Sequence, residues 1–272
     1  MSRITIAERN RLIQEYYERF HQAQYLVWDP LLIVHEFKGS SQQEYVALIS
    51  ALLALGGVKQ IIASVKTWVE RLDLQHQKIQ DFSEAQLIAK AGIFRHRFYN
   101  ERDMILLSLL YKRSVREHGS LAEHFLSHHH ENFETVEQGL SGLIADYKKW
   151  AQESSYLPGP HFKHLLNSPR QGSTCKRWLM YLKWVVRKDD GIDLGLWSRH
   201  SPLRPDQLLI PLDTHLFKIS KRLGLTTKKT ANWNTSLEVT RSLKKIDPLD
   251  PTKFDFSLCR FGMLDYRKLL SD

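Results

Sequence analysis

Residues 168–187 read SPRQGSTCKRWLMYLKWVVR, and residues 211–224 read PLDTHLFKISKRLG. In the first segment a turn rich in small residues precedes apolar positions whose spacing predicts a helix that begins at Lys176. In the second segment Asp213 is placed to begin another helix, because aspartate is a preferred N-cap residue. A lysine at one helix start and an aspartate at another can place an amine nucleophile beside a carboxylate. The function therefore depends on whether the two side chains meet in space.

The composition indicates a chain with a sizeable core and a basic surface. Of the 272 residues 42% are hydrophobic, enough to bury a core in one large domain or two small ones. The 39 Lys+Arg against 30 Asp+Glu give a formal net charge of +9. A polyanion such as DNA is a fitting partner for this charge, although excess charge also serves solubility alone.

Several classes of protein are excluded by the sequence. No window contains about 18 consecutive apolar residues, which argues against a membrane span, and residues 1–20 carry too many charges for a signal peptide. We therefore expect a cytoplasmic protein without a membrane partner. The cysteines, Cys175 and Cys259, are far apart and outside any C-x-x-C motif. This excludes a cysteine-rich zinc site and a four-cysteine iron–sulfur cluster, and we expect no cofactor.

Helical periodicity predominates along the chain, whereas alternating runs bounded by turn residues are scarce. We predict an all-α chain of about ten helices. Ser83 with Gln86 and Thr235 with Glu238 form capping-box patterns at two of the helix starts. The predicted helical segments are 5–22, 31–37, 42–55, 58–72, 83–93, 100–118, 121–128, 135–150, 176–187, 214–223, 235–246 and 254–270.

The helix from residue 176 combines a basic face with apolar remaining faces. The basic face holds Lys176, Met180, Lys183 and Arg187. It can meet phosphates while the rest of the helix packs in the core. Lys176, in the first turn, feels the positive end of the helix dipole and its neighbours Arg177 and Lys183, which disfavours the ammonium form and favours a nucleophilic amine. The alternative interpretation is a phosphate-binding or exposed lysine.

Asp213 has a structural interpretation too, as the N-cap of its helix. The structural and catalytic interpretations are compatible, because a capping carboxylate can face a cleft. No acidic residue occurs from Thr214 through Lys229, and the lysines of this run suit a nucleic-acid backbone. The turn at 168–175 lies ahead of a helix start, where backbone N–H groups can bind a phosphate, although it lacks the Walker A spacing.

A histidine-rich segment raises the question of a metal site. His124 and His128 are spaced i, i+4, and His129, His130 and Glu131 follow. The pattern is not H-E-x-x-H, and it is typical of a helix end that runs into a loop. We therefore favour a solvated surface and expect no metal site.

The segment from Pro211 to Leu225 resembles the V-D-T-H-x-x-R-x-x-x-R-L segment of the helix–hairpin–helix DNA glycosylases typified by endonuclease III. Asp213 matches the catalytic aspartate of that family. Lys176 occupies the position of its catalytic lysine, which opens the helix after the hairpin. Residues 254–262 resemble the helix near the end of the same domain. The chain as a whole resembles the bacterial DUF2400 family, whose nearest characterised neighbours are the archaeal 8-oxoguanine DNA glycosylases.

The resemblance implies two helical subdomains that flank a basic cleft, without an iron–sulfur cluster. A terminal subdomain would comprise residues 1–40 and 190–272, and a central subdomain residues 41–189, including the hairpin at 168–175. It further implies a monomeric DNA glycosylase with associated β-lyase activity that excises a damaged base, such as an oxidised one, from duplex DNA. Lys176 would be the Schiff-base nucleophile and Asp213 the catalytic carboxylate. The residues expected to contact DNA are Arg170, Gly172, Ser173, Arg177, Lys183, His215 and Lys218.

The sequence also departs from the glycosylase pattern. Residues 168–174 replace the usual L-P-G-V-G hairpin, and the turn at 55–57 has no glutamine to fill the space of a flipped base. The excised base and the choice between DNA and RNA stay open, although Trp28, Phe98 and Trp197 could each stack on a base. Two alternatives remain, a non-catalytic nucleic-acid-binding protein on the same fold and a regulatory or interaction protein. The basic run 214–229 argues against the second.

Overall fold

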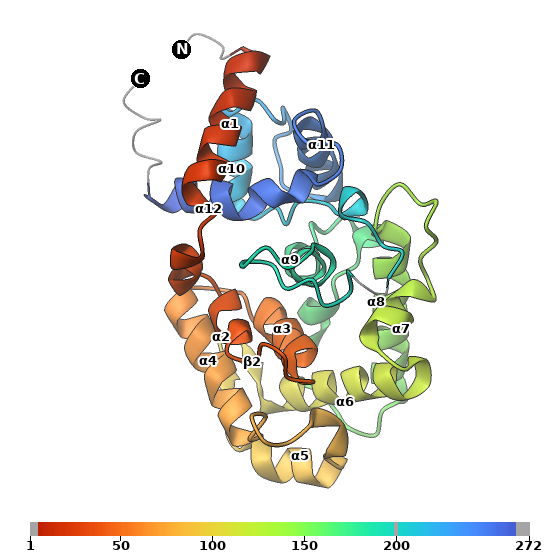
Figure 1. The fold of residues 1–272 in the computed structure, drawn as a ribbon. Helices are drawn as coiled ribbons and strands as arrows, with labels where there is room; N and C mark the ends of the chain where they lie inside the picture. Colours follow the sequence, from red (N-terminus) through yellow and green to blue (C-terminus); the bar gives the residue numbers. More distant parts are fainter. Residues whose placement is uncertain (1–4, 199–200, 265–272) are drawn as a thin grey trace. The chain divides into compact units, whose positions relative to one another are not determined.

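A computed structural model describes residues 5–198 and 201–264, and these are mostly helical, as predicted (Figure 1). A two-residue antiparallel ladder joins β1 (Arg95–His96) to β2 (Tyr99–Asn100). The α-helices are α1 (Ile6–Phe20), α2 (Leu31–His35), α3 (Gln43–Leu52), α4 (Val58–Arg71), α5 (Glu84–Ala91), α6 (Glu101–His118), α7 (Leu121–Leu126), α8 (Glu137–Glu153), α9 (Lys176–Val186), α10 (Thr214–Arg222), α11 (Trp233–Lys244) and α12 (Phe254–Leu264). The 3₁₀ helices are η1 (Ala23–Trp28), η2 (Ile79–Asp81), η3 (Phe162–Leu166), η4 (Pro169–Gln171), η5 (Pro205–Gln207) and η6 (Pro251–Lys253).

The chain divides into two compact units. Unit 1 consists of Met1–Leu26, Glu134–Val136 and Gly172–Asp272, and unit 2 of Val27–Phe133 and Glu137–Gln171. By this division 27–40 belong to unit 2 and α9 belongs to unit 1, and the subdomain bounds that the resemblance implies stay a prediction. Backbone bonds explain the placement of α9: the carbonyls of Trp184 and Val185 accept from the amides of Leu194 and Trp197, each at 2.8 Å.

Unit 1 is built around α12, which packs against α1 and α10. The helices share one apolar cluster, with Ile13 from α1, Ile219 from α10 and Leu258 from α12 all buried. The ring of Tyr16 stacks on Phe261 with 3.9 Å between centroids. Gly262 permits the close approach of α12 and α10, since a Cβ there would lie 2.3 Å from Cδ1 of Ile219.

Unit 2 is a succession of paired helices around α3. The pairs α2–α3, α3–α4, α5–α6, α6–α7 and α7–α8 are in contact. Every residue of α3 except Glu44 is buried, which makes α3 the central helix of the unit. Tyr45 on α3 joins its neighbours through hydrogen bonds, since its hydroxyl accepts from Nε1 of Trp68 at 2.9 Å and lies 2.6 Å from Oγ of Ser108.

Capping residues determine where several helices begin. The capping box of Ser83 and Gln86 at α5 is confirmed, and Ser120 caps α7 as predicted. The capping box predicted at Thr235 is wrong. Asn232 caps α11 instead, accepting from the amide of Thr235 at 3.0 Å, and the earlier start buries Trp233 inside the helix.

Other helix ends also differ from the prediction. The α5 helix ends at Ala91 rather than 93, because Gly92 takes a positive φ of 54°. The last predicted helix ran to 270, and residues 265–270 lie outside the described part of the chain. Across 5–198 and 201–264 none of the helices combines the length and the apolar character that crossing a membrane requires.

Candidate active site

The helix α9 begins at Lys176, as the sequence predicts. Its N-cap, Cys175, has left-handed backbone dihedrals with φ 46°. A residue with a Cβ adopts this conformation at a cost of roughly 1–2 kcal/mol, so the surrounding turn must hold it. The amide of Cys175 donates to Oγ of Ser173 at 3.2 Å, which closes the turn. The chain therefore bends sharply immediately before Lys176.

Lys176 is half-buried, and its ammonium has neighbours on unit 1. Nζ lies 3.2 Å from Sδ of Met180, one turn further along α9. Burial raises the pKa of two groups on α12, the carboxyl of Asp255 and the thiol of Cys259, and the positive charge of Lys176 opposes part of this rise. Lys176 therefore lies close enough to α12 to act electrostatically on its buried acidic groups.

Asp213 is the N-cap of α10, which confirms its structural interpretation. Its Oδ1 accepts from the amide of Leu216 at 2.8 Å. Burial raises the pKa values of Asp255 and Cys259, and the negative charge of Asp213 raises both further, opposing Lys176. The charges of Lys176 and Asp213 thus act on the pKa values of the same two groups of α12. Both predicted catalytic residues therefore lie within electrostatic range of this helix.

Lys183 has a different role from the one expected. We expected it to contact DNA, but it is 1% exposed. Its Nζ lies 3.0 Å from Oδ1 of Asp193 and 3.4 Å from Oδ2 of Asp255. Burial alone would lower the pKa of Lys183, but the two carboxylates outweigh burial and raise the pKa above its usual range. The expectation was wrong because this face of α9 packs against acidic side chains of unit 1 instead of facing solvent.

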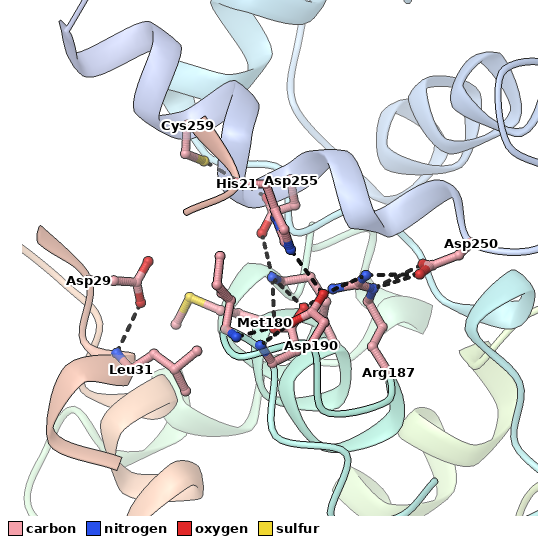
Figure 2. A network of polar contacts seen from close by, with 12 residues as sticks. His21, Asp29, Leu31, Met180, Arg187, Asp190, Asp250, Asp255 and Cys259 are labelled. Atoms are coloured by element: carbon pink, nitrogen blue, oxygen red, sulfur yellow. Dashed lines mark hydrogen bonds and ion pairs between the residues drawn. The ribbon is translucent and has the colours of Figure 1, made fainter. Parts of the chain in front are cut away.

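Arg187 extends the same buried ion network (Figure 2). Its guanidinium pairs with Asp193, lies 2.9 Å from Oδ2 of Asp250 and 3.1 Å from Oδ2 of Asp190. Nε2 of His21, just after α1, lies 2.9 Å from the same oxygen of Asp190. The network links the end of α9 to His21, just after α1, and to Asp250, just before η6. It fixes the helix that carries Lys176.

The other predicted DNA contacts have varied positions. Arg170 lies exposed on unit 2, whereas Gly172 and Ser173 belong to unit 1, so the predicted hairpin spans the junction of the units along the chain. Arg177 is half-buried. His215 and Lys218 are exposed on α10, the helix that Asp213 caps.

An exposed aromatic side chain lies beside two arginines on unit 2. Phe98, 39% exposed, occupies the turn between β1 and β2. With Gln60, Arg95 and Arg97 it lines an open cavity of about 490 Å³. Trp28 is exposed as well, whereas Trp197 is buried and cannot stack on a base. The sequence did not predict the strand ladder because its two-residue strands are too short to show alternation.

The histidine-rich segment is a solvated surface only at its end, where His130 and Glu131 are exposed. His124 is completely buried, and its Nε2 lies 3.1 Å from Oδ2 of Asp146. Burial lowers the pKa of His124 to about 4, since its hydrogen bond to Asp146 does not offset the loss of water. The expectation was wrong because α8 covers the end of α7, which the sequence alone does not reveal.

These features define a mostly helical protein in which a buried ion network holds the helix that begins with Lys176, and in which Asp213 caps another helix of the same unit. A family model described as "Protein of unknown function (DUF2400)" matches residues 29–264. The chain belongs to this family, which confirms that part of the resemblance. No curated protein and no solved structure matches the chain.

Proposed function

We propose that this chain is a DNA glycosylase with an associated β-lyase activity, in which Lys176 is the nucleophile and Asp213 the catalytic carboxylate. The observation that supports the proposal is that Lys176 opens α9 and Asp213 caps α10, and that both helix starts belong to unit 1. In the proposal these two starts, far apart in sequence, supply the amine and the carboxylate of one site. Such a pair suits covalent catalysis at a sugar carbon.

The reaction starts with base release. The neutral amine of Lys176 attacks C1′ of the nucleotide, and the N-glycosidic bond breaks with its electron pair leaving on the base, which takes up a proton. The carboxylate of Asp213 stabilises the positive charge that develops on the sugar. The nitrogen then loses a proton, and the sugar ring opens to a protonated Schiff base between Nζ and C1′.

The strand is cut in the second stage. The Schiff base acidifies C2′, a proton leaves that carbon, and the C3′–O bond breaks with its electron pair on the departing phosphate. Water then hydrolyses the conjugated imine and releases Lys176. Neither stage needs an oxidant or a reductant.

The cap contact of Asp213 is compatible with this role. Only Oδ1 accepts from the amide of Leu216, and a carboxylate has a second oxygen and further lone pairs. His215 and Lys218 are exposed on the same helix, and in the proposal they contact phosphates near the reacting nucleotide.

The turn between β1 and β2 supplies a second DNA contact in our proposal. Stacking of a base on an aromatic ring is worth about 1–3 kcal/mol, and the partly exposed Phe98 lines the same open cavity as Arg95 and Arg97. The arginines add charge contacts to the backbone. Phe98 would thus stack on an unpaired base in the distorted duplex.

Borohydride trapping tests the proposal. Duplexes carrying an abasic site or one of a panel of damaged bases are incubated with the protein and reduced. A covalent adduct is expected with the wild type and with Lys66→Gln, which removes an exposed lysine of α4, and no adduct with Lys176→Gln. Tight DNA binding without adduct or base release on any substrate would instead favour the non-catalytic nucleic-acid-binding alternative.

A further inference from the structure

Three side chains with metal-binding atoms converge where α7 ends beside α8. Nε2 of His124 lies 3.1 Å from Oδ2 of Asp146, and Nε2 of His128 lies 2.6 Å from the same oxygen. One ligand atom from each residue lies within 4.8 Å of the others. All three belong to unit 2. Two imidazoles and a carboxylate are a donor set typical of zinc sites.

Two glycines on α8 make this convergence possible. A Cβ on Gly142 would lie 2.3 Å from Cγ of His128, and a Cβ on Gly139 would lie 2.5 Å from Cζ of Phe125. Glycine inside a helix costs roughly 0.5–1 kcal/mol relative to alanine. At these two positions glycine lets the end of α7 pack closely against α8. This packing brings the ring of His128 to Asp146.

Surrounding contacts hold the ring of His124 in place. Its Nδ1 lies 2.9 Å from Oγ of Ser114 on α6, and that hydroxyl can accept from an Nδ1–H because it has other acceptors for its own proton. The ring stacks on His118, at 4.2 Å between centroids, and on Trp150, at 4.8 Å. Such outer contacts fix the tautomer in which Nε2 is the ligand atom.

The burial of the cluster suits an ion that enters from solvent. His124 is completely buried, whereas the side chains of His128 and Asp146 are 32% and 31% exposed. An ion could therefore reach the cluster and complete its coordination with water.

We propose that His124, His128 and Asp146 bind one divalent transition-metal ion of the class that Zn²⁺ represents, with water in the fourth position. Tetrahedral coordination with bonds of about 2.0–2.1 Å places ligand atoms roughly 3.3 Å apart. The present spacings of 2.6 and 3.1 Å therefore need only small side-chain movements. Each ring would bind with its proton on Nδ1. The ion would link α7 to α8 within unit 2, apart from the chemistry proposed for Lys176 and Asp213.

Calorimetric titration of the chelator-treated protein with ZnCl₂ tests the site. One equivalent should bind, and His128→Gln or Asp146→Asn should each weaken binding more than about tenfold. Both side chains are partly exposed, and circular dichroism verifies that the variants fold. His76→Gln is the matched control, because it removes an exposed histidine whose Nδ1 lies 2.8 Å from Oδ1 of Asp73. Its binding should equal that of the wild type.

Co²⁺ provides a second measurement that needs no variant. Bound by His124, His128 and Asp146, it should show the intense visible absorption of tetrahedral coordination. Absence of one-to-one Zn²⁺ binding would overturn the proposal. So would equal affinity in the two ligand variants, or a Co²⁺ spectrum that matches the ion in water.

Discussion

Nζ of Lys183 lies 3.0 Å from Oδ1 of Asp193, and both side chains are shielded from solvent. The pair lies on the helix that begins with Lys176 and on the loop that follows it. Asp255 on α12 approaches the same ammonium. The charges of Lys176 and Asp213 also act on the pKa of Asp255. Asp255 therefore lies between the buried ion pair and the candidate catalytic residues in this network of charges.

Replacing Lys183 by methionine should destabilise the protein by about 3–5 kcal/mol, because it removes the buried cation that pairs with Asp255 and leaves Asp193 with Arg187 alone. The measurement is the free energy of unfolding from a urea titration. Lys221→Met is the control, since Lys221 is exposed on α10, and should change stability by no more than about 0.5 kcal/mol. Equal stability of the two variants would contradict the structural role of Lys183.

Asp213 allows capping and catalysis to be separated. Asp213→Asn keeps a side-chain oxygen for the amide of Leu216, so stability should stay close to that of the wild type, while the lyase reaction is lost with the charge. Asp213→Ala should lose the reaction and also about 1 kcal/mol of stability. The measurements are product formation on an abasic duplex and thermal unfolding. Full lyase activity of Asp213→Asn would contradict the catalytic role of Asp213 and would show that this residue only caps α10.

Stability should decrease as pH falls from about 6.5 to about 4, because His124 titrates near 4 in the folded protein and near 6.5 when unfolded. Over this range the unfolded chain binds the proton and the folded protein does not. His118 and His128 also face the ring and oppose its protonation, whereas Asp146 favours it. The total effect is about 3 kcal/mol.

Urea titrations of the metal-free protein between pH 4 and 7.5 measure this dependence. The slope of stability against pH should become shallower in His124→Gln, whatever the absolute stability of that variant. An identical slope in both proteins, or stability that rises as the pH falls, would be incompatible with a buried neutral His124.

Gly142→Ala should destabilise the protein by about 1–3 kcal/mol, because the added Cβ collides with the ring of His128. At an unobstructed helix position the same substitution would stabilise the protein. Adding His128→Gly removes both the ring and the Cβ of His128, which the added Cβ would meet at 2.3 and 2.5 Å, and should recover most of the loss. The four-variant cycle of unfolding free energies measures this coupling. Additive effects of the two substitutions would show that the ring does not lie over Gly142.

The removal of the exposed aromatic ring tests the proposed DNA contact on unit 2. Phe98→Ala should weaken binding to a duplex with an abasic site by about 1–3 kcal/mol. It should leave the salt dependence of binding unchanged, because no charge is lost. Arg97→Gln should instead reduce the salt dependence. Fluorescence anisotropy at several salt concentrations separates the two effects, and unchanged affinity in both variants would remove this turn from the interface.

The sequence predicts local features of this protein better than its tertiary contacts. The starts of α9 and α10 follow from a turn and a capping aspartate, both of which act within a few residues. The burial of Lys183 could not be predicted, because its partners Asp193 and Asp255 come from a loop and a distant helix. The helical spacing predicts that Lys176, Lys183 and Arg187 form a basic face able to meet phosphates. In the structure, carboxylates of unit 1 pair with two of these residues, Lys183 and Arg187.

The histidine cluster illustrates the same limit. The i, i+4 spacing of His124 and His128 is visible in the sequence, but Asp146 and the glycine beneath His128 belong to another helix. Only the packing of α7 on α8 shows that the three side chains converge. Because α8 buries His124, a segment that the sequence predicts at the surface contains a candidate metal site.

The most direct measurement of the proposed function is the identity of the residue that borohydride links to DNA. The wild type is trapped on a duplex with an abasic site, digested, and the modified peptide is sequenced by mass spectrometry. The adduct should lie on Lys176 and should be absent in Lys176→Gln, while Lys66→Gln gives the wild-type yield. An adduct on another lysine, or none on any substrate despite tight binding, would contradict the assignment of Lys176 as the nucleophile.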